Sequence, residues 1–419
     1  MAEIITLSLI AIIALLGFFG NVIFNRTNIP STLWLLLFGL LLSQVFNFVN
    51  RGALTSMTSI MGAIAIITIL SEGGMSLDIR EMILEAPKGF LLLVIGLIFS
   101  VGATVGIMMA FGFSLEISLF TGLALGGTSA SVVMPIVTKM KGLSEKVVSI
   151  LSFESIADTF TIVIALFVLD VMTGEIAQIS IGSMVNPIFS GITIGLFVGV
   201  GWGFLLRKLK NEEHNYVATL AILFLTYAVA EYVNASGAIA CFTAGIALGN
   251  YELFSKLINP RREPANHFET IKFHSLITFF VRTFYFVFVG AVVLITNYLG
   301  MLVGGLICIT FLVVRFFYVK ILTRGDKSLT NFDKNTMTVL FPRGLSAAVL
   351  ATIPLSRGIE GADIVVDIVF SVIIGTILIS TIGMFFIMRK HNKKFKESQK
   401  NPKKKIKTKP KKKGVESEE

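Results

Sequence analysis

Two carboxylates stand in an apolar run that is long enough to span a membrane. The run LSFESIADTFTIVIALFVL, from Leu151 to Leu169, contains Glu154 and Asp158 four residues apart. Residues with this spacing lie one above the other on one face of a helix. Acids within a bilayer span are costly and therefore mark a site. Two stacked anions repel unless a cation lies near them or one of them is protonated. The spacing therefore predicts a site that holds either a cation or a proton.

The composition places this site in a membrane protein with many spans. Of the 419 residues, 54% are hydrophobic and 15% are charged, and the mean hydropathy is +0.82. These values exclude an ordinary water-soluble domain. The first apolar run lacks a basic start and a small-residue cleavage site, so we expect a span and not a signal peptide. We predict an all-α polytopic fold with about 13 spans, at 4–24, 32–48, 55–74, 89–111, 115–137, 147–172, 184–205, 216–233, 236–249, 273–295, 301–322, 335–355 and 364–388.

The basic residues predict the orientation, because cytoplasmic loops are rich in Lys and Arg. With the N-terminus outside, the outer loops contain only Arg51 and Arg357, while the inner loops and the tail contain most of the 36 basic residues. We therefore expect a multi-pass cell-membrane protein with a cytoplasmic C-terminus. Residues 1–390 would form the transmembrane domain, and 391–419 a disordered basic tail beside anionic lipid. The net charge of +10 then requires no nucleic-acid partner.

Two of the predicted spans are expected to be interrupted. GLALGGTSASVVMP, residues 122–135, places glycines, Thr128 and Ser129 ahead of a proline. Irregular backbone is tolerated at membrane depth only where it is buried in protein or lines a wet cavity. Close helix packing by small residues is the alternative. The stretch from Gly344 to Pro354 echoes this pattern in a span of opposite direction, which is typical of an inverted-repeat transporter. Spans 1–6 and 8–13 would be the repeats, with span 7 as a connector.

Arg343 is predicted to pair with Glu154. At the helical rise of 1.5 Å per residue, Glu154 lies about 10 Å, Asp158 about 16 Å and Arg343 about 12 Å from the cytoplasmic ends of their spans. An arginine can bind a carboxylate with two hydrogen bonds, which would leave Asp158 to titrate. Arg315 lies near the inner end of its span, so we expect it to snorkel. Glu72, followed by two glycines, either lines the inner approach to the site or ends its helix.

Several stretches together resemble the monovalent cation/proton antiporters, and most closely the archaeal and bacterial sodium/proton exchangers. These stretches are SEGGMSLD (71–78), LGGTSASVVMP (125–135), LSEKVVSILSFESIADTF (143–160), SGAIACFTAGIALGN (236–250) and FPRGLSAAVLATIP (341–354). The resemblance implies a homodimer with inverted repeats, two crossing broken helices, and exchange by an elevator-like movement of a core against a dimerisation domain. It implies a transporter of sodium ions and protons, with no cofactor and no enzymatic reaction.

The resemblance also implies roles for individual residues. Asp158 would bind a sodium ion or a proton in competition, and Thr128 would help to bind the ion. Glu154 would pair with Arg343. Glu72 matches a glutamate at the cytoplasmic edge of the family's site.

The sequence departs from the family's pattern at one position. Related exchangers often place the acid five residues after the glutamate, whereas here Asp158 follows by four and Thr159 takes the fifth position. Either the helix is shifted locally and Asp158 is the family's acid, or Asp158 takes the position before the acid and Thr159 takes the position of the acid itself. One free acid favours one-for-one, electroneutral exchange. Potassium/proton exchange is the nearest alternative. An ion channel is more remote, because the sequence contains neither a TVGYG-type filter nor rings of like charge. A sodium-coupled symporter is a further remote alternative, since such transporters share the crossing helices.

Overall fold

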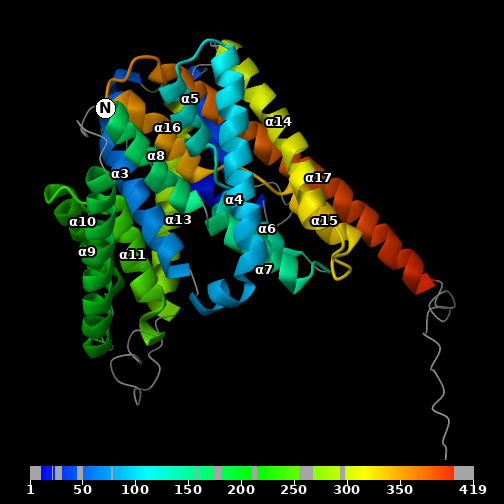
Figure 1. Cartoon of the computed structure of the whole chain (residues 1–419), viewed down its shortest axis with the longest axis horizontal. Coiled ribbons are helices and arrows are strands. Elements are labelled where there is room, and N and C mark those ends of the chain that lie inside the picture. Colours follow the sequence, from blue (N-terminus) through cyan, green and yellow to red (C-terminus); the bar gives the residue numbers. More distant parts are fainter. Residues whose placement is uncertain are drawn as a thin grey trace, which may run out of the picture.

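The computed structural model describes residues 11–20, 22–23, 31–44, 51–76, 79–140, 142–156, 158–173, 181–209, 215–253, 268–292 and 298–400, and every regular element in these ranges is an α-helix (Figure 1). A first helical segment covers Ala11–Gly20. The others are α2 (Ser31–Gln44), α3 (Arg51–Ser76), α4 (Ile79–Ala110), α5 (Leu115–Ala124), α6 (Ala130–Lys139), α7 (Glu145–Ile156), α8 (Asp158–Met172), α9 (Ile181–Lys208), α10 (Asn215–Tyr232), α11 (Gly237–Gly249), α13 (Phe268–Val292), α14 (Tyr298–Leu322), α15 (Asn331–Val339), α16 (Leu345–Ser356) and α17 (Ala362–Lys400).

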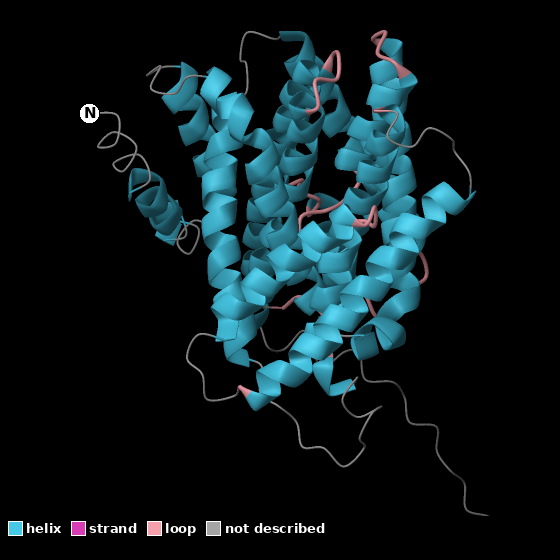
Figure 2. Cartoon of the chain, turned by 90° about the vertical axis from the view of Figure 1, so that its left-hand side faces the viewer, coloured by secondary structure: helices cyan, strands magenta, loops and turns pink. Residues whose placement is uncertain are grey.

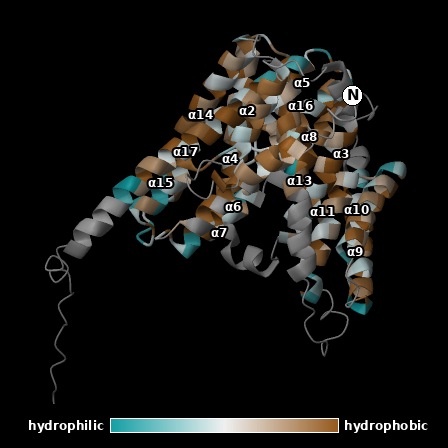
Figure 3. Ribbon diagram, turned by 180° about the vertical axis from the view of Figure 1, so that it is seen from behind, coloured by the Kyte–Doolittle hydropathy of each residue, from teal (hydrophilic) through white to brown (hydrophobic). Residues whose placement is uncertain are grey.

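The outward surfaces of these helices are apolar. Large side chains such as Phe197 and Ile98 are 82% and 63% exposed. Figure 3 shows hydrophobic residues along the helices and hydrophilic ones mostly near their ends. Within the described residues, five helices are long and apolar enough to cross a membrane, and further apolar helices are shorter. Such surfaces match lipid, so the fold is that of an all-helical membrane protein.

The helices pack as two groups. We call α2, α3, α9, α10, α11 and α13 the first group, and α4 to α8 with α14 to α17 the second group. In Figure 1, α9 to α11 lie on the opposite side of the molecule from α14, α15 and α17. Helix α16 is the main bridge, because it packs on α3 and α13 as well as on α8 and α17. A buried hydrogen bond of 2.6 Å between Tyr285 Oη of α13 and Thr352 Oγ1 of α16 joins the groups.

Helix α3 continues through the glycine pair that follows Glu72. The helix ends at Ser76, so interpreting the pair as a helix stop is wrong. A Cβ atom on Gly74 would lie 2.3 Å from the carbonyl oxygen of Phe242 in α11. The glycine lets two helix backbones touch, which is how small residues promote helix packing in membranes.

Helix α17 extends past the predicted domain boundary. It continues to Lys400, so the prediction of disorder from residue 391 is wrong for 391–400. That segment, HNKKFKESQK, is rich in good helix formers and contains neither glycine nor proline. The rest of the predicted tail, 401–419, lies outside the described residues.

The start of α15 is fixed by Asp333, which lies just before the predicted span. Its carboxylate accepts hydrogen bonds from the backbone N–H of Thr330 at 2.9 Å and of Ser144 at 3.0 Å. Thr330 in turn accepts a bond from the Asp333 N–H at 3.1 Å, which completes a capping box. Burial opposes ionisation of Asp333, but the hydrogen bonds from Ser144 and Thr330 lower its pKa below the ordinary value. The cap therefore ties α15 to the α6–α7 connection.

Asp333→Asn should destabilise the protein by about 1–2 kcal/mol at neutral pH, because a charged cap is lost. A lowered pKa contributes stability above the unfolded value of about 3.9, and this contribution disappears as the pH falls through the folded value. The difference between variant and wild type in unfolding free energy, measured by intrinsic fluorescence in detergent, should therefore shrink below about pH 4. Glu360→Gln, at an exposed position, is the control. A difference that stays constant down to pH 3 would contradict the assignment.

Candidate functional site

The two predicted interruptions are present, and they meet in the centre of the molecule. Helix α5 ends at Ala124 and α6 begins at Ala130, while α15 ends at Val339 and α16 begins at Leu345. Figure 2 shows the extended connections between surrounding helices. The backbone N–H of Ser129 in one connection donates to the carbonyl oxygen of Pro342 in the other at 2.9 Å. The interrupted helices therefore cross, as predicted.

The close approach at this crossing requires a glycine. A Cβ atom on Gly344 would lie 2.0 Å from Ser129 Oγ and 2.4 Å from Ser129 Cβ. Both residues belong to the stretches that the sequence identified as echoes of one another. The small residues at the crossing therefore have two roles. They allow the two connections to come into close contact, and they favour interruption of the helices.

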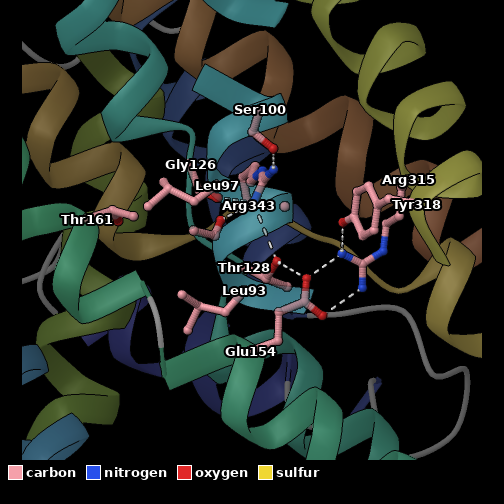
Figure 4. Close-up of a pocket in the computed structure, with 12 residues that line it drawn as sticks. Leu93, Leu97, Ser100, Gly126, Thr128, Glu154, Thr161, Arg315, Tyr318 and Arg343 are labelled. Carbon is pink, nitrogen blue, oxygen red and sulfur yellow. Dashed lines mark hydrogen bonds and ion pairs between the residues drawn. The ribbon is translucent and has the colours of Figure 1, made fainter. Parts of the chain in front are cut away.

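A buried ion pair lies next to the crossing. Glu154 of α7 and Arg315 of α14 are 4% and 2% exposed. Arg315 Nη2 donates to Glu154 Oε2 at 2.8 Å, and Nη1 donates to Oε1. This bidentate arrangement is the stronger form of an arginine–carboxylate contact. Figure 4 shows both interactions and the Tyr318 hydroxyl that accepts a bond from Arg315 Nη1 at 2.8 Å.

The predicted pairing of Glu154 with Arg343 is therefore wrong, and so is the prediction that Arg315 snorkels. Arg315 lies seven residues before the end of α14 at Leu322, or about 10 Å at the helical rise. This is the depth estimated for Glu154. Depth along a helix does not decide which arginine reaches Glu154. The pairing depends on how the helices pack, and α4 contacts both α7 and α14.

Arg343 binds backbone carbonyl groups instead. It is 3% exposed, and its Nη1 donates to the carbonyl oxygen of Gly126 at 3.2 Å and to that of Gly127. Its Nη2 donates to Ser100 Oγ of α4 at 2.9 Å, and its guanidinium lies 4.7 Å from the ring centroid of Phe311. Arg343 therefore places a positive charge at the C-terminal end of α5, where the helix dipole is negative.

Arg315 has the same relation to the other broken helix. Its Nε donates to the carbonyl oxygen of Met337 at 2.7 Å, and its Nη2 donates to that of Leu340 at 3.0 Å. These carbonyls lie at the C-terminal end of α15. Each interrupted helix thus ends against one arginine, which stabilises carbonyl groups that have no partner within the helix.

Thr128 connects the two arginine environments. Its hydroxyl donates to Glu154 Oε1 at 3.2 Å and accepts from Arg343 Nη1 at 3.4 Å. These residues line a small cavity of about 10 Å³ (Figure 4), close to the minimum that holds one water molecule. The structure therefore brings together three predicted site residues, Thr128, Glu154 and Arg343, although in different pairs from those expected.

The remaining predicted site residues lie elsewhere or outside the described side chains. Ser129 is buried at the crossing. Glu72 is partly exposed on α3 and is not among the described residues that line this cavity. Asp158 and Thr159 begin α8, which follows Glu154 along the chain, but their side chains lie outside the described part. Their roles stay predictions.

Sequence reasoning missed Arg315, Tyr318 and Ser100. Tyr318 lies three residues after Arg315 on α14, a spacing that brings side chains together on a helix, so this pair had a detectable signal. Ser100 had only the weak signal of a hydroxyl within the apolar α4. Among the described residues, no group of three or more His, Cys, Asp or Glu side chains forms a metal site.

Apolar outer faces and two interrupted helices that meet beside a buried charge network place this protein in the class of polytopic helical membrane proteins. The chain belongs to the sodium/hydrogen exchanger family. The family model, described as "Sodium/hydrogen exchanger, transmembrane", matches residues 9–390. This result confirms the resemblance found in the sequence.

Individual relatives and a solved structure are similar over much of the chain. The high-affinity Na⁺/H⁺ antiporter NhaS3 of Synechocystis is 26% identical over 209 residues, which cover 48% of this chain and 45% of the relative. The K⁺/H⁺ antiporter NhaP2 of Shewanella is 24% identical over 327 residues, which cover 75% and 54%. The chain thus spans about half the length of these relatives. The sodium proton antiporter MjNhaP1 of Methanocaldococcus jannaschii shares the fold, with a TM-score of 0.74 at 19% identity over 93% of this chain and 98% of that one.

Proposed function

We propose that this protein exchanges cytoplasmic sodium (or lithium) ions for protons by alternating access, and that Asp158 binds either the ion or the proton. The observation that carries the proposal is the buried network of Glu154, Thr128 and the two arginines at the crossing of the interrupted helices. Such a crossing is where inverted-repeat transporters bind their ions. Asp158 begins the helix that follows Glu154 along the chain.

The charges of the network favour one-for-one exchange. Glu154 is matched by Arg315 in a bidentate ion pair, so this pair adds no net charge to the site. An ionised Asp158 would then offset Arg343, and the site would gain one positive charge whether it took up a sodium ion or a proton. The two loaded states would carry the same charge, and exchange would be electroneutral. Thr128, Ser129 and Thr159 supply hydroxyl groups near the ion, and Glu72 on α3 lines its inner approach.

The proposal includes an architecture. Thirteen spans would form two inverted repeats, spans 1–6 and 8–13, with the N-terminus outside and the C-terminus in the cytoplasm. Described helices lie in every predicted span range, and the two interrupted helices fall in the fifth and twelfth. The protein would function as a homodimer in the cell membrane, its first group of helices serving for dimerisation and its second group carrying the site.

Potassium/proton exchange is the second candidate. It is favoured by the similarity to K⁺/H⁺ antiporters over 75% of this chain.

The test is proton efflux from acid-loaded vesicles that contain the purified protein. Sodium or lithium should drive efflux, and Asp158→Asn should lower the initial rate at least about tenfold, the effect of a binding group worth about 1.4 kcal/mol. Glu360→Gln, at an exposed position, should match the wild type. Efflux driven by potassium alone would support the second candidate. No response to any of the three ions would refute exchange, and an active Asp158→Asn variant would refute the role of Asp158.

A further inference from the structure

Glycines make close contacts between helices inside each of the two groups. In the first group, a Cβ atom on Gly199 of α9 would lie 2.7 Å from the carbonyl oxygen of Ala244 in α11. In the second group, a Cβ atom on Gly304 of α14 would lie 2.6 Å from Ser371 Cβ in α17. Glycines at such points let neighbouring helices approach closely and interlock. Each group is therefore tightly packed within itself.

The contact of α16 with α3, which belongs to the surface between the groups, is looser. Gly62 of α3 faces α16 of the second group, and a Cβ atom there would lie 3.9 Å from Ile353 Cγ1, an ordinary contact distance. At this point α16 meets α3 through a side chain and without a close backbone contact. Helices that pack through side chains can slide past each other by small shifts. This surface is therefore better suited to movement than the interior of either group.

A buried polar contact crosses the surface between the groups. Tyr285 of α13 and Thr352 of α16 are 2% and 0% exposed, and their hydroxyl oxygens are 2.6 Å apart. The Thr352 hydroxyl also donates to the carbonyl oxygen of Val349 at 2.9 Å. A hydroxyl carries one proton, so Thr352 accepts the bond from Tyr285. The donor thus belongs to the first group and the acceptor to the second.

This direction of donation makes the bond sensitive to the arrangement of the groups. The bond from Thr352 to Val349 lies within α16 and moves with that helix, whereas the Tyr285 hydroxyl loses its acceptor when α16 moves away from α13. A hydrogen bond of ordinary net strength changes an equilibrium constant by a factor of about 2 to 12. The bond therefore favours the arrangement of the groups seen in this structure by about that factor.

We propose that the hydrogen bond from Tyr285 to Thr352 is a latch, which holds the two groups in this arrangement and breaks when the second group moves against the first. The inference rests on the proposed function, because alternating access requires two arrangements in equilibrium. Neither residue is among those described as lining the cavity of the charge network. The latch therefore acts on the movement of the groups and not on the binding of the ion.

The test measures the distance between the groups in the absence of transported ions. Spin labels are attached at Tyr232→Cys, at the end of α10, and at Glu360→Cys, which follows α16; both positions are exposed. The native Cys241 and Cys308 are buried. Double electron–electron resonance in lipid nanodiscs, with labelled protein diluted in unlabelled protein, gives the populations of the arrangements. Tyr285→Phe should lower the share of the main wild-type population, relative to the others, about 2- to 12-fold.

Variants of the acceptor test the direction of the bond. Thr352→Ser keeps a hydroxyl and should match the wild type. Thr352→Val leaves the buried Tyr285 hydroxyl without its acceptor, which costs more than loss of the bond, so it should shift the populations further than Tyr285→Phe. Adding Tyr285→Phe to Thr352→Val removes the unpaired donor and should bring the populations back to those of Tyr285→Phe alone. A double variant that is shifted further than Thr352→Val would contradict the latch.

A matched hydrogen bond within one group provides the control. Thr219 of α10 accepts from Trp202 Nε1 of α9 at 2.9 Å and donates to the carbonyl oxygen of Asn215 at 2.8 Å. Both helices belong to the first group, so Thr219→Val should leave the populations unchanged. An unchanged distribution in Tyr285→Phe, or an equal shift in Thr219→Val, would overturn the latch. Shifted populations in a protein without ion-driven proton efflux would refute the exchange function and leave the latch standing.

Discussion

Replacing Arg315 by methionine should lower the free energy of unfolding by about 3–5 kcal/mol, the usual result of removing one partner from a buried ion pair. Glu154 would lose its bidentate partner in a site where it is 4% exposed. The carbonyl groups of Met337 and Leu340 would also lose their donors, which adds the cost of unsatisfied buried acceptors. The measurement is equilibrium unfolding in mixed detergent micelles, beside proton efflux from vesicles.

A double-mutant cycle separates the two arginines. Glu154→Gln combined with Arg315→Met should recover about 2–3 kcal/mol of the loss, because no buried charge is left unpaired. The same cycle with Arg343→Met should give a smaller coupling, since Arg343 reaches Glu154 only through Thr128 in the described contacts. A larger coupling to Arg343 than to Arg315 would contradict the pairing in the structure.

Gly344→Ala should disrupt the crossing of the interrupted helices. The new Cβ atom would overlap both Oγ and Cβ of Ser129, and only the first of these can move by rotation of a side chain. Overpacking of a buried contact costs about 1–3 kcal/mol. Because the displaced backbone also carries Thr128, we expect ion-driven proton efflux to fall more than stability does.

The partner of Gly344 provides the control. Ser129→Ala removes the hydroxyl but leaves the Cβ atom of residue 129. That atom would still lie 2.4 Å from the Cβ atom introduced at position 344, so Ser129→Ala should not rescue Gly344→Ala. Ser129→Gly removes both atoms and should restore most of the stability and of the efflux. Rescue by alanine as complete as by glycine would show that the backbones are less closely packed than in the structure.

The two arginines explain why irregular backbone is tolerated at this depth. Interrupting a helix leaves carbonyl groups without partners, which is costly away from water. Arg315 and Arg343 each donate to carbonyls at one such helix end. Each arginine also contacts the acid or the hydroxyl nearest the proposed ion site, so the groups that stabilise the fold and the groups that set the charge of the site are the same.

The amino-acid sequence by itself determined the class of fold, the positions of the two interrupted helices and the presence of an acid at membrane depth. The hydropathy pattern specified apolar helices, because a segment that spans lipid must satisfy its backbone hydrogen bonds internally and expose apolar side chains. Glycines and hydroxyl residues ahead of Pro135 and Pro354 specified two interruptions, and Glu154 marked a charged site at membrane depth. All of these properties follow from local composition.

The tertiary structure alone decided which charges meet. Arg315 and Arg343 lie at similar depth along their helices, and only the packing of α14 beside α4 and α15 brings Arg315 to Glu154 while Arg343 reaches the end of α5. The role of Gly74 was also undecided, because a glycine that ends a helix and a glycine that permits contact with α11 look alike in sequence. Contacts between residues far apart in the chain depend on how helices pack, and local patterns carry little information about that packing.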